Sequence, residues 1–284
     1  MQIPSASVIS HWPAANYTNP VTRGPAAIIV VSVLLFLVTT LLAIRIYTRL
    51  RISKGFGLDD VLILVAYVPT AAFASISFVA QVDFGWGRHV WDIPLNFVTP
   101  GLQLSLASQL LFDLSTTLTK LSMLSLIYRV VSIDNSRYRY IVIAVAAFVS
   151  LDGLIFFILV TFHEHSPVSA YWTLSIEPQM CINQPKHLLA AGCINTITDF
   201  IIVLIPIPYV RRLKLPRKQQ IIVGSLFAGG VFVTAAGAVR TAVTFMSYDD
   251  PNKDLTWNSI SVLIVSALEL HIGIICASIP SIKP

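Results

Sequence analysis

The sequence predicts an all-α membrane protein, a bundle of seven transmembrane helices with its N-terminus outside and its C-terminus in the cytosol. Composition is the first observation: 55% of the 284 residues are hydrophobic and only 12% are charged, whereas soluble domains carry roughly 25% charged residues. The second is that the apolar residues fall into seven stretches, each near the about 20 residues that a helix needs to cross a bilayer. The third is an uneven distribution of Lys and Arg among the connectors.

The predicted spans form one membrane domain, residues 24–282, after a short extracytosolic segment at residues 1–23. The spans lie near residues 24–46, 61–82, 101–128, 139–162, 187–210, 220–246 and 257–280. Residues 1–23 lack the basic start and apolar core of a signal peptide, so we expect the first span to remain as an anchor. Only short connectors separate the spans, which leaves no room between them for a soluble domain.

Orientation follows from the basic residues of the connectors. The connectors after the first, third and fifth spans and the tail, counted with Arg45 and Arg139 at the adjoining span ends, hold 13 Lys and Arg residues, and the opposite side holds 4. Cytosolic connectors carry the excess of Lys and Arg, so we expect the N-terminus outside. The net charge of +5 then reflects topology and contact with anionic lipids, and no nucleic-acid partner is expected. On the outer side, Asn16 begins a glycosylation sequon, although its closeness to the membrane disfavours its use.

Two connectors carry short motifs. Asp59 and Asp60 stand where the second span begins. They either cap the helix, because carboxylates are favourable at a helix N-terminus, or dock a partner. The outer connector at residues 83–94 contains tryptophans, which suit the headgroup level of a membrane. It is either an interfacial loop or a lid over an outward-facing cavity, with Arg88 and His89 directed at a ligand.

No metal site is expected. The pair of histidines at 163–165 does not have the spacing of a strong ligand motif. Cys193 and Cys276 lie within predicted spans as small apolar residues, and Cys181 lies in an outer connector with no obvious partner. No cofactor is expected either, because neither a glycine-rich phosphate loop nor an Asp-rich diphosphate motif is present in the sequence.

Ionisable residues inside the predicted spans are the strongest functional signal. Each costs roughly 2.5–3.5 kcal/mol at the centre of a bilayer, and such residues normally face the bundle interior and pair with one another. The six are Asp113, Lys120, Asp152, Asp199, Arg240 and Glu269.

Depth predicts which of these residues meet. Lys120 lies nine residues before Arg129 at the inner end of the third span, and Asp199 lies twelve before Arg211 at the inner end of the fifth. At about 1.5 Å of rise per residue, the two differ in depth by only about 4–5 Å, within reach of their side chains. We therefore predict a Lys120–Asp199 ion pair, with Asn195 one turn away in the same network.

A second pair is predicted between Arg240 and Glu269, with His271 at similar depth. Four acids against two bases leave at least two carboxyls that are unpaired, neutral or in contact with water. A carboxyl that stays neutral in a cavity can donate a proton, so Asp113 and Glu269 are the candidate catalytic acids. The alternatives are a polar network that only fixes helix packing, a ligand or catalytic cavity, and a path for protons.

Five stretches in order resemble a known family over about residues 25–282. They are "RIYTRL…GLDD", "GWGRHVWDIP", "LTKLSMLSLIYRV", "INTITDFIIVLIPIPYVRRLKLPRKQQ" and "GAVRT". They are similar to the fungal integral membrane proteins named for a rhodopsin domain, which include the Pth-type receptors. The resemblance implies a fungal source, seven helices and an outward N-terminus. Retinal is not expected despite the name, because retinal proteins use a Lys in the last helix and residues 257–280 contain none.

Three functions remain open. In the first, the protein serves fungal specialised metabolism and binds a small lipophilic molecule in an intramembrane polar cavity, where it could catalyse a cofactor-free cyclisation or isomerisation beside other biosynthetic enzymes. The alternative is a receptor-like sensor of an extracellular small molecule. A proton-coupled carrier is the weakest, because no duplicated half is present in the sequence. The membrane is either the plasma membrane or that of the endoplasmic reticulum or vesicles.

Overall fold

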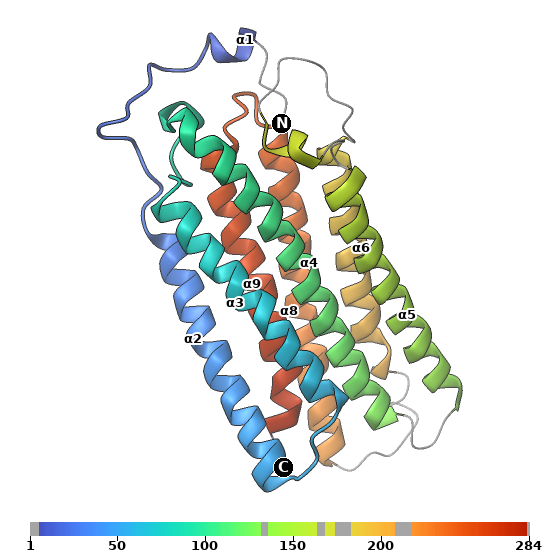
Figure 1. Cartoon of the computed structure of the whole chain (residues 1–284). Coiled ribbons are helices and arrows are strands. Elements are labelled where there is room, and N and C mark those ends of the chain that lie inside the picture. The colour runs from blue at the N-terminus through green and yellow to red at the C-terminus, as the bar shows by residue number, and fades with distance from the viewer. Residues whose placement is uncertain (1–5, 132–135, 164–167, 174–182, 208–216, 283–284) are drawn as a thin grey trace.

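The computed structural model describes residues 6–131, 136–163, 168–173, 183–207 and 217–282. In this part of the chain seven helices are long and apolar enough to cross a membrane. They lie side by side as one bundle, and the two termini are at opposite ends of it (Figure 1). The predicted fold class, a seven-transmembrane-helix bundle, is confirmed; which end faces the cytosol stays a prediction.

The long helices are α2 (Ala26–Tyr47), α3 (Leu58–Val82), α4 (Leu95–Val131), α5 (Ser136–Ile158), α6 (Gln184–Leu204), α8 (Arg217–Tyr248) and α9 (Leu255–Ile282). Short turns accompany them: α1 (Ala6–Ile9), η1 (Thr48–Ile52), η2 (Val90–Asp92), η3 (Leu159–His163) and η4 (Val168–Tyr171). Several helices extend past the predicted apolar stretches, α4 most of all. Hydropathy detects only the part of a helix that lies in hydrocarbon, whereas backbone hydrogen bonding continues into the interface.

The helices differ in how much of their surface the bundle covers. Helix α9 is the most buried of the seven and α5 the least. Helix α9 packs against α8, α2, α4 and α3, whereas α5 packs mainly on α4. Helix α5 therefore presents most of its apolar side chains outward, as a lipid-facing helix does.

The interior is layered along the bundle axis. One apolar cluster includes Phe73 and Leu263 in the half that holds the start of α2, and a second includes Leu124 and Ile274 in the other half. Polar residues lie between these clusters along α3, α4, α6 and α9. The buried ones are Thr70, Ser115, Thr116, Thr119, Lys120, Thr198, Asp199, Glu269 and His271.

Helices α6 and α8 approach each other closely. A Cβ atom added at Gly192 would lie 2.5 Å from Thr241 Oγ1, and one added at Gly230 would collide with Val203. Small residues let helix backbones come together in membranes, where van der Waals packing drives association. Because α6 and α8 are close, Asn195 of α6 and Arg240 of α8 both reach Glu269 of α9.

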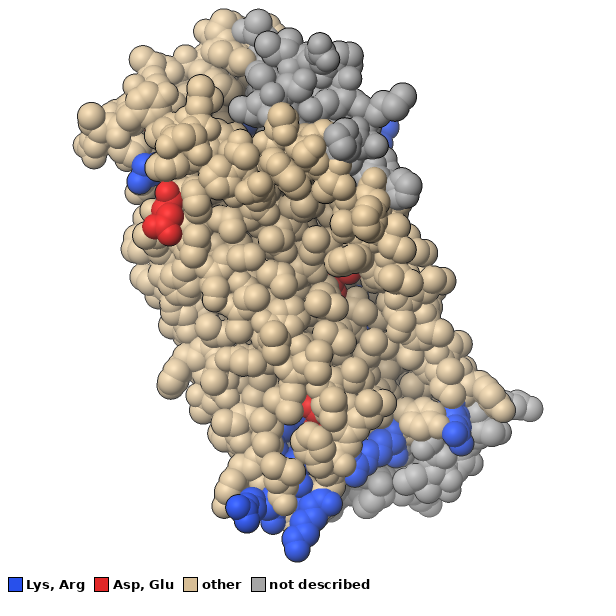
Figure 2. Space-filling view, viewed as in Figure 1, with Lys and Arg blue, Asp and Glu red and all other residues tan. Residues whose placement is uncertain are grey.

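Basic residues gather at one end of the molecule. Figure 2 shows Lys and Arg side chains crowded at the end where the C-terminus lies, which also holds the connection between α2 and α3. The middle of the visible face is almost free of charge. This is the surface expected of a protein whose central band is in contact with hydrocarbon.

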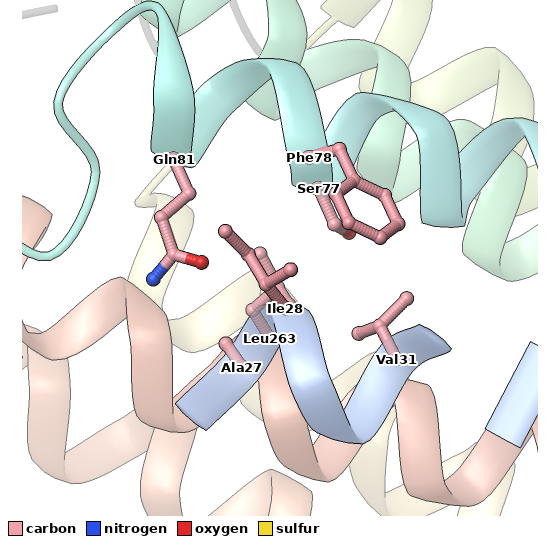
Figure 3. A pocket seen from close by; sticks show the side chains of 7 residues that line it. All are labelled: Ala27, Ile28, Val31, Ser77, Phe78, Gln81 and Leu263. Atoms are coloured by element: carbon pink, nitrogen blue, oxygen red, sulfur yellow. The ribbon is translucent and has the colours of Figure 1, made fainter. Parts of the chain in front are cut away.

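An apolar crevice between α2, α3 and α9 is lined by side chains that include Val31, Phe78 and Leu263 (Figure 3). Its volume is about 0 Å³, so it cannot admit even a water molecule. The crevice is a narrow gap in the packing of the three helices.

Candidate functional site: a buried charge network

Lys120 of α4 lies at the centre of the polar layer. Its Nζ donates hydrogen bonds to Asn195 O at 2.8 Å, to Asn195 Oδ1 at 2.8 Å and to Thr198 Oγ1 at 2.6 Å. An ammonium group has three donors, so these bonds use all of them. Asp199 Oδ1 lies 3.3 Å from the same Nζ and supplies the opposite charge.

The pattern on α6 explains why one lysine meets three residues. Asn195, Thr198 and Asp199 are spaced three and four residues apart, so they share one helix face. That face is directed at α4, because Lys120 contacts all three residues. The structure thus brings together the two residues that depth alone predicted to pair.

A second ion pair continues the network. Arg240 Nε of α8 donates to Glu269 Oε2 of α9 at 2.7 Å. The guanidinium group also lies over the ring of Phe112, 4.6 Å from its centroid, which offers a favourable cation–π contact. The structure therefore also brings together the predicted Arg240 and Glu269.

Asn195 joins the two pairs. Its Oδ1 accepts from Lys120, and its Nδ2 donates to Glu269 Oε1 at 2.6 Å. A continuous path of polar contacts therefore runs from Asp199 through Lys120, Asn195 and Glu269 to Arg240. We call these five residues the charge network; it connects α4, α6, α8 and α9.

The charge network is neutral and deeply buried. Lys120 is 6% exposed, Asp199 7% and Glu269 2%. The charges of Lys120 and Arg240 balance those of the two carboxylates. Removing one member of a buried pair typically costs about 3–5 kcal/mol, because it leaves a charge without compensation. The network therefore stabilises the contacts among the four helices in the arrangement described here.

A small cavity adjoins the charge network. Its lining includes Thr116, Thr119, Lys120, Asp199 and Glu269, and its volume is about 20 Å³. Pockets for drug-sized ligands measure roughly 300–1,000 Å³. In the arrangement described here the cavity can take a group no larger than a water molecule.

The other predicted membrane-depth residues lie outside this path. Asp113 of α4 and Asp152 of α5 are partly exposed, and Asp113 lies within electrostatic range of Asp152, Lys120 and Arg240. Among the described residues, neither carboxyl has a hydrogen-bond or ion-pair partner. His271 is fully buried, and its Nδ1 lies 2.6 Å from Ala267 O one turn earlier on α9. The catalytic roles predicted for Asp113 and Glu269 stay predictions.

His89 is held in an aromatic stack at the end of the bundle where α9 begins. Its ring lies between those of Trp91 and Trp257, with centroids 4.6 Å and 4.0 Å away and nearly parallel planes. Its Nδ1 lies 2.5 Å from Asp254 Oδ2. The His89 side chain therefore binds the two connectors to each other.

Arg88 contributes through its backbone. Its carbonyl oxygen accepts from Thr256 Oγ1 at 3.0 Å, and its backbone pairs with Thr22. The N-terminal segment is tied in further, since Trp12 Nε1 donates to Asn252 O at 3.0 Å. We call residues 6–25, 83–94 and 249–257 the loop cap. Whether the cap acts as a lid over a ligand stays a prediction.

Two other sequence expectations can be placed. The side chain of Asn16 is exposed and closes a local turn, its Oδ1 accepting from Thr18 and its Nδ2 donating to Asn19 O at 2.9 Å; glycosylation there stays a prediction. The histidine pair at 163–165 lies outside the residues whose side chains are described. Within the described part of the chain, no group of three or more His, Cys, Asp or Glu residues could hold a metal ion.

Sequence reasoning missed a second charge cluster at the opposite end of the bundle. Buried Arg45 of α2 donates to Asp59 Oδ2 at 2.9 Å, to Asp60 Oδ1 at 2.8 Å and to Ala277 O of α9 at 2.6 Å. Arg49 and Arg129 also lie within 4 Å of these carboxylates. We call Arg45, Arg49, Arg129, Asp59 and Asp60 the arginine–aspartate clasp.

A signal for the clasp was present in the sequence. Asp60 does cap α3, since its Oδ2 accepts from Gly57 N at 3.0 Å, as the capping interpretation predicts. Arg45, however, falls inside the predicted first span rather than in the connector to which its charge was assigned. An arginine within an apolar span requires an acidic partner, and the nearest carboxylates in the sequence are Asp59 and Asp60.

The fold and the two charge clusters define a multi-pass membrane protein with seven helices and a charged interior. The chain matches the fungal rhodopsin domain over residues 44–284, and it belongs to that family. No solved structure matches the chain.

Several curated fungal proteins are similar to the chain. "Receptor GIN3" of Arthrobotrys oligospora is 27% identical over 87% of the chain and 59% of its own length. "Fugralins biosynthesis cluster protein 2" of Gibberella zeae is 23% identical over 81% and 58%, and "Wortmanamides biosynthesis cluster protein C" of Talaromyces wortmannii is 22% identical over 84% and 64%. The chain thus spans about three fifths of the length of these relatives.

Proposed function

We propose that this protein is a receptor-like sensor whose charge network changes its pairing when a small molecule binds. One observation carries the proposal. The five residues of the charge network, each in contact with the next, connect α4, α6, α8 and α9 within one buried layer. A shift of any of these helices must break a buried charge contact or exchange its partner. A network of this kind favours a few discrete arrangements of the helices over a continuous range of helix positions. A switch between two states requires such discrete arrangements.

Two further observations support the proposal. The cavity beside the charge network measures about 20 Å³, which suits a structural element better than the binding site of a lipophilic substrate. The chain is also similar, over 87% of its own residues, to a protein that is named as a receptor. Under this proposal the loop cap, with Arg88 and His89, is the part that a ligand reaches first from outside.

The test compares a gene-deletion strain of the source fungus with strains complemented by the wild-type chain or by variants. Lys120→Met breaks the charge network, and Lys186→Met removes an exposed lysine at the start of α6 as the matched control. We expect deletion and Lys120→Met to abolish a transcriptional response to added culture extract, whereas Lys186→Met retains it. Immunoblotting of membranes establishes that each variant is present at the wild-type level.

A second candidate function has its own support. Two relatives are named for biosynthesis clusters, and the partly exposed carboxyls of Asp113 and Asp152 could give a proton to a lipophilic intermediate that arrives from the bilayer. Metabolite profiles of the same strains separate the candidates. Accumulation of a precursor in the deletion strain, with an unchanged transcriptional response, would reject the sensor in favour of a role in specialised metabolism.

A further inference from the structure

Two buried oxygen atoms beside the charge network have no hydrogen-bond partner among the described residues. They are Asp199 Oδ2 of α6 and Thr119 Oγ1 of α4. Both oxygen atoms are buried, and their residues are only 6% exposed for Thr119 and 7% for Asp199. Both residues line the same cavity of about 20 Å³.

The size and polarity of the cavity match those of an internal water site. A cavity needs about 10–15 Å³ to hold one water molecule, which typically makes about three hydrogen bonds to buried polar groups. Besides the two oxygens, the cavity is lined by Thr116 and Glu269, whose oxygens can accept a further bond. A buried polar atom at membrane depth is costly without a partner, so occupancy by water is favoured.

Charge selects a neutral occupant. The cations of Lys120 and Arg240 already balance the carboxylates of Asp199 and Glu269 in the charge network. A metal ion next to Asp199 would also lie close to the Lys120 ammonium, which is 3.3 Å from Asp199 Oδ1. A water molecule meets both needs, because it can accept from the Thr119 hydroxyl and donate to the free carboxylate oxygen.

We propose that this cavity binds one water molecule, which accepts a hydrogen bond from Thr119 and donates one to Asp199 Oδ2. The water completes the contact between α4 and α6 on the side that Lys120 does not reach. It is a structural water molecule. This proposal does not depend on whether the protein acts as a sensor.

Thr119→Val tests the proposal, because the proposal predicts whether the unfolding temperature falls. Valine keeps the shape of threonine and removes the hydroxyl. If the hydroxyl binds water, the variant leaves that water short of a partner, and the unfolding temperature in detergent should fall by about 2–4 °C. If the hydroxyl has no partner, its removal should leave the unfolding temperature unchanged or raise it, which would overturn the proposal.

Thr244→Val is the matched control. Thr244 of α8 also has a buried hydroxyl without a partner among the described residues, but it does not line this cavity. We expect its replacement to leave the unfolding temperature unchanged or slightly higher. An equal fall in both variants would show that the loss comes from threonine replacement in general, and the proposal would fail.

Infrared spectroscopy detects the water directly in the wild-type chain. Difference spectra between samples in ordinary water and in ¹⁸O-labelled water should show a shifted O–H band of a strongly bonded internal water, and the band should disappear in Thr119→Val. A wild-type spectrum without such a band would overturn the proposal.

A comparison of two salts distinguishes a bound water molecule from a bound cation. Unfolding temperatures are compared in sodium chloride and in choline chloride at equal ionic strength. We expect no difference for the wild-type chain. A rise in sodium that Asp199→Asn abolishes would assign the cavity to a cation and contradict the water site.

Discussion

Lys120 and Asp199 are unequal partners. The ammonium group of Lys120 has three hydrogen-bond acceptors besides Asp199, so it keeps polar contacts when the carboxylate is removed. Asp199 has no other cation within 4 Å in the described part of the chain. The carboxylate therefore depends on the lysine more than the lysine depends on the carboxylate.

Replacement of Lys120 by Met should therefore destabilise the fold more than replacement of Asp199 by Leu. Lys120→Met leaves a buried carboxylate without its cation, which costs roughly 3–5 kcal/mol in comparable broken pairs. The double variant Lys120→Met with Asp199→Leu strands neither charge and should be more stable than Lys120→Met alone. Thermal unfolding in detergent measures all three, with Lys186→Met as the exposed control. A double variant less stable than both single variants would show that the residues act independently.

Helices α6 and α8 meet through glycine rather than through interlocking large side chains. The Cα of Gly192 faces the Thr241 side chain, so that an added Cβ would lie only 2.5 Å from Thr241 Oγ1. Helix α8 also contains Gly224, where no side chain that the structure describes lies within 4 Å of an added Cβ. The two glycines give opposite expectations for the same substitution.

Gly192→Ala should destabilise the bundle, and Gly224→Ala should not. At Gly192 the new methyl group forces α6 and α8 apart, and overpacking of this kind costs roughly 1–3 kcal/mol. At Gly224 the methyl group meets none of the described side chains, and alanine favours helix by about 0.5–1 kcal/mol over glycine. The unfolding temperatures of the two variants in detergent test this difference in stability. Equal effects would show that α6 and α8 tolerate a wider separation than the structure has.

The arginine–aspartate clasp joins α2, α3 and α9 at the basic end of the bundle. Arg45→Met should cost roughly 3–5 kcal/mol, because it removes the buried cation from two carboxylates and a donor from Ala277 O. Arg51→Met, at an exposed position in η1, is the control and should leave stability unchanged. Unfolding in detergent gives the measurement. Wild-type stability of Arg45→Met would mean that the remaining arginines neutralise the aspartates without it.

On the face shown in Figure 2, most of the Lys and Arg side chains lie at the end of the molecule where the C-terminus lies. Because cytosolic connectors are enriched in Lys and Arg, we expect that end in the cytosol and the loop cap outside. Reporter fusions that are active only in the cytosol should give signal at the C-terminus and none at the N-terminus. Signal from the N-terminal fusion would invert the orientation and place the loop cap inside.

Much of the arrangement along the membrane normal could be predicted from the sequence. Bilayer thickness fixes the length of an apolar span, and the rise of the helix converts residue number into depth. These two relations predicted seven spans and placed Lys120 level with Asp199, and they also put Arg240 within reach of Glu269. Each depends only on the residues of one helix and on the solvent around it.

Lateral contacts were decided by the tertiary structure alone. Asn195 connects the two ion pairs, and the ring of His89 lies between two tryptophans. Such contacts depend on the rotation of each helix about its axis and on which helices are neighbours. Both are set by close packing between segments far apart in the sequence, such as the approach of α6 to α8 at Gly192, and hydropathy carries no record of that packing.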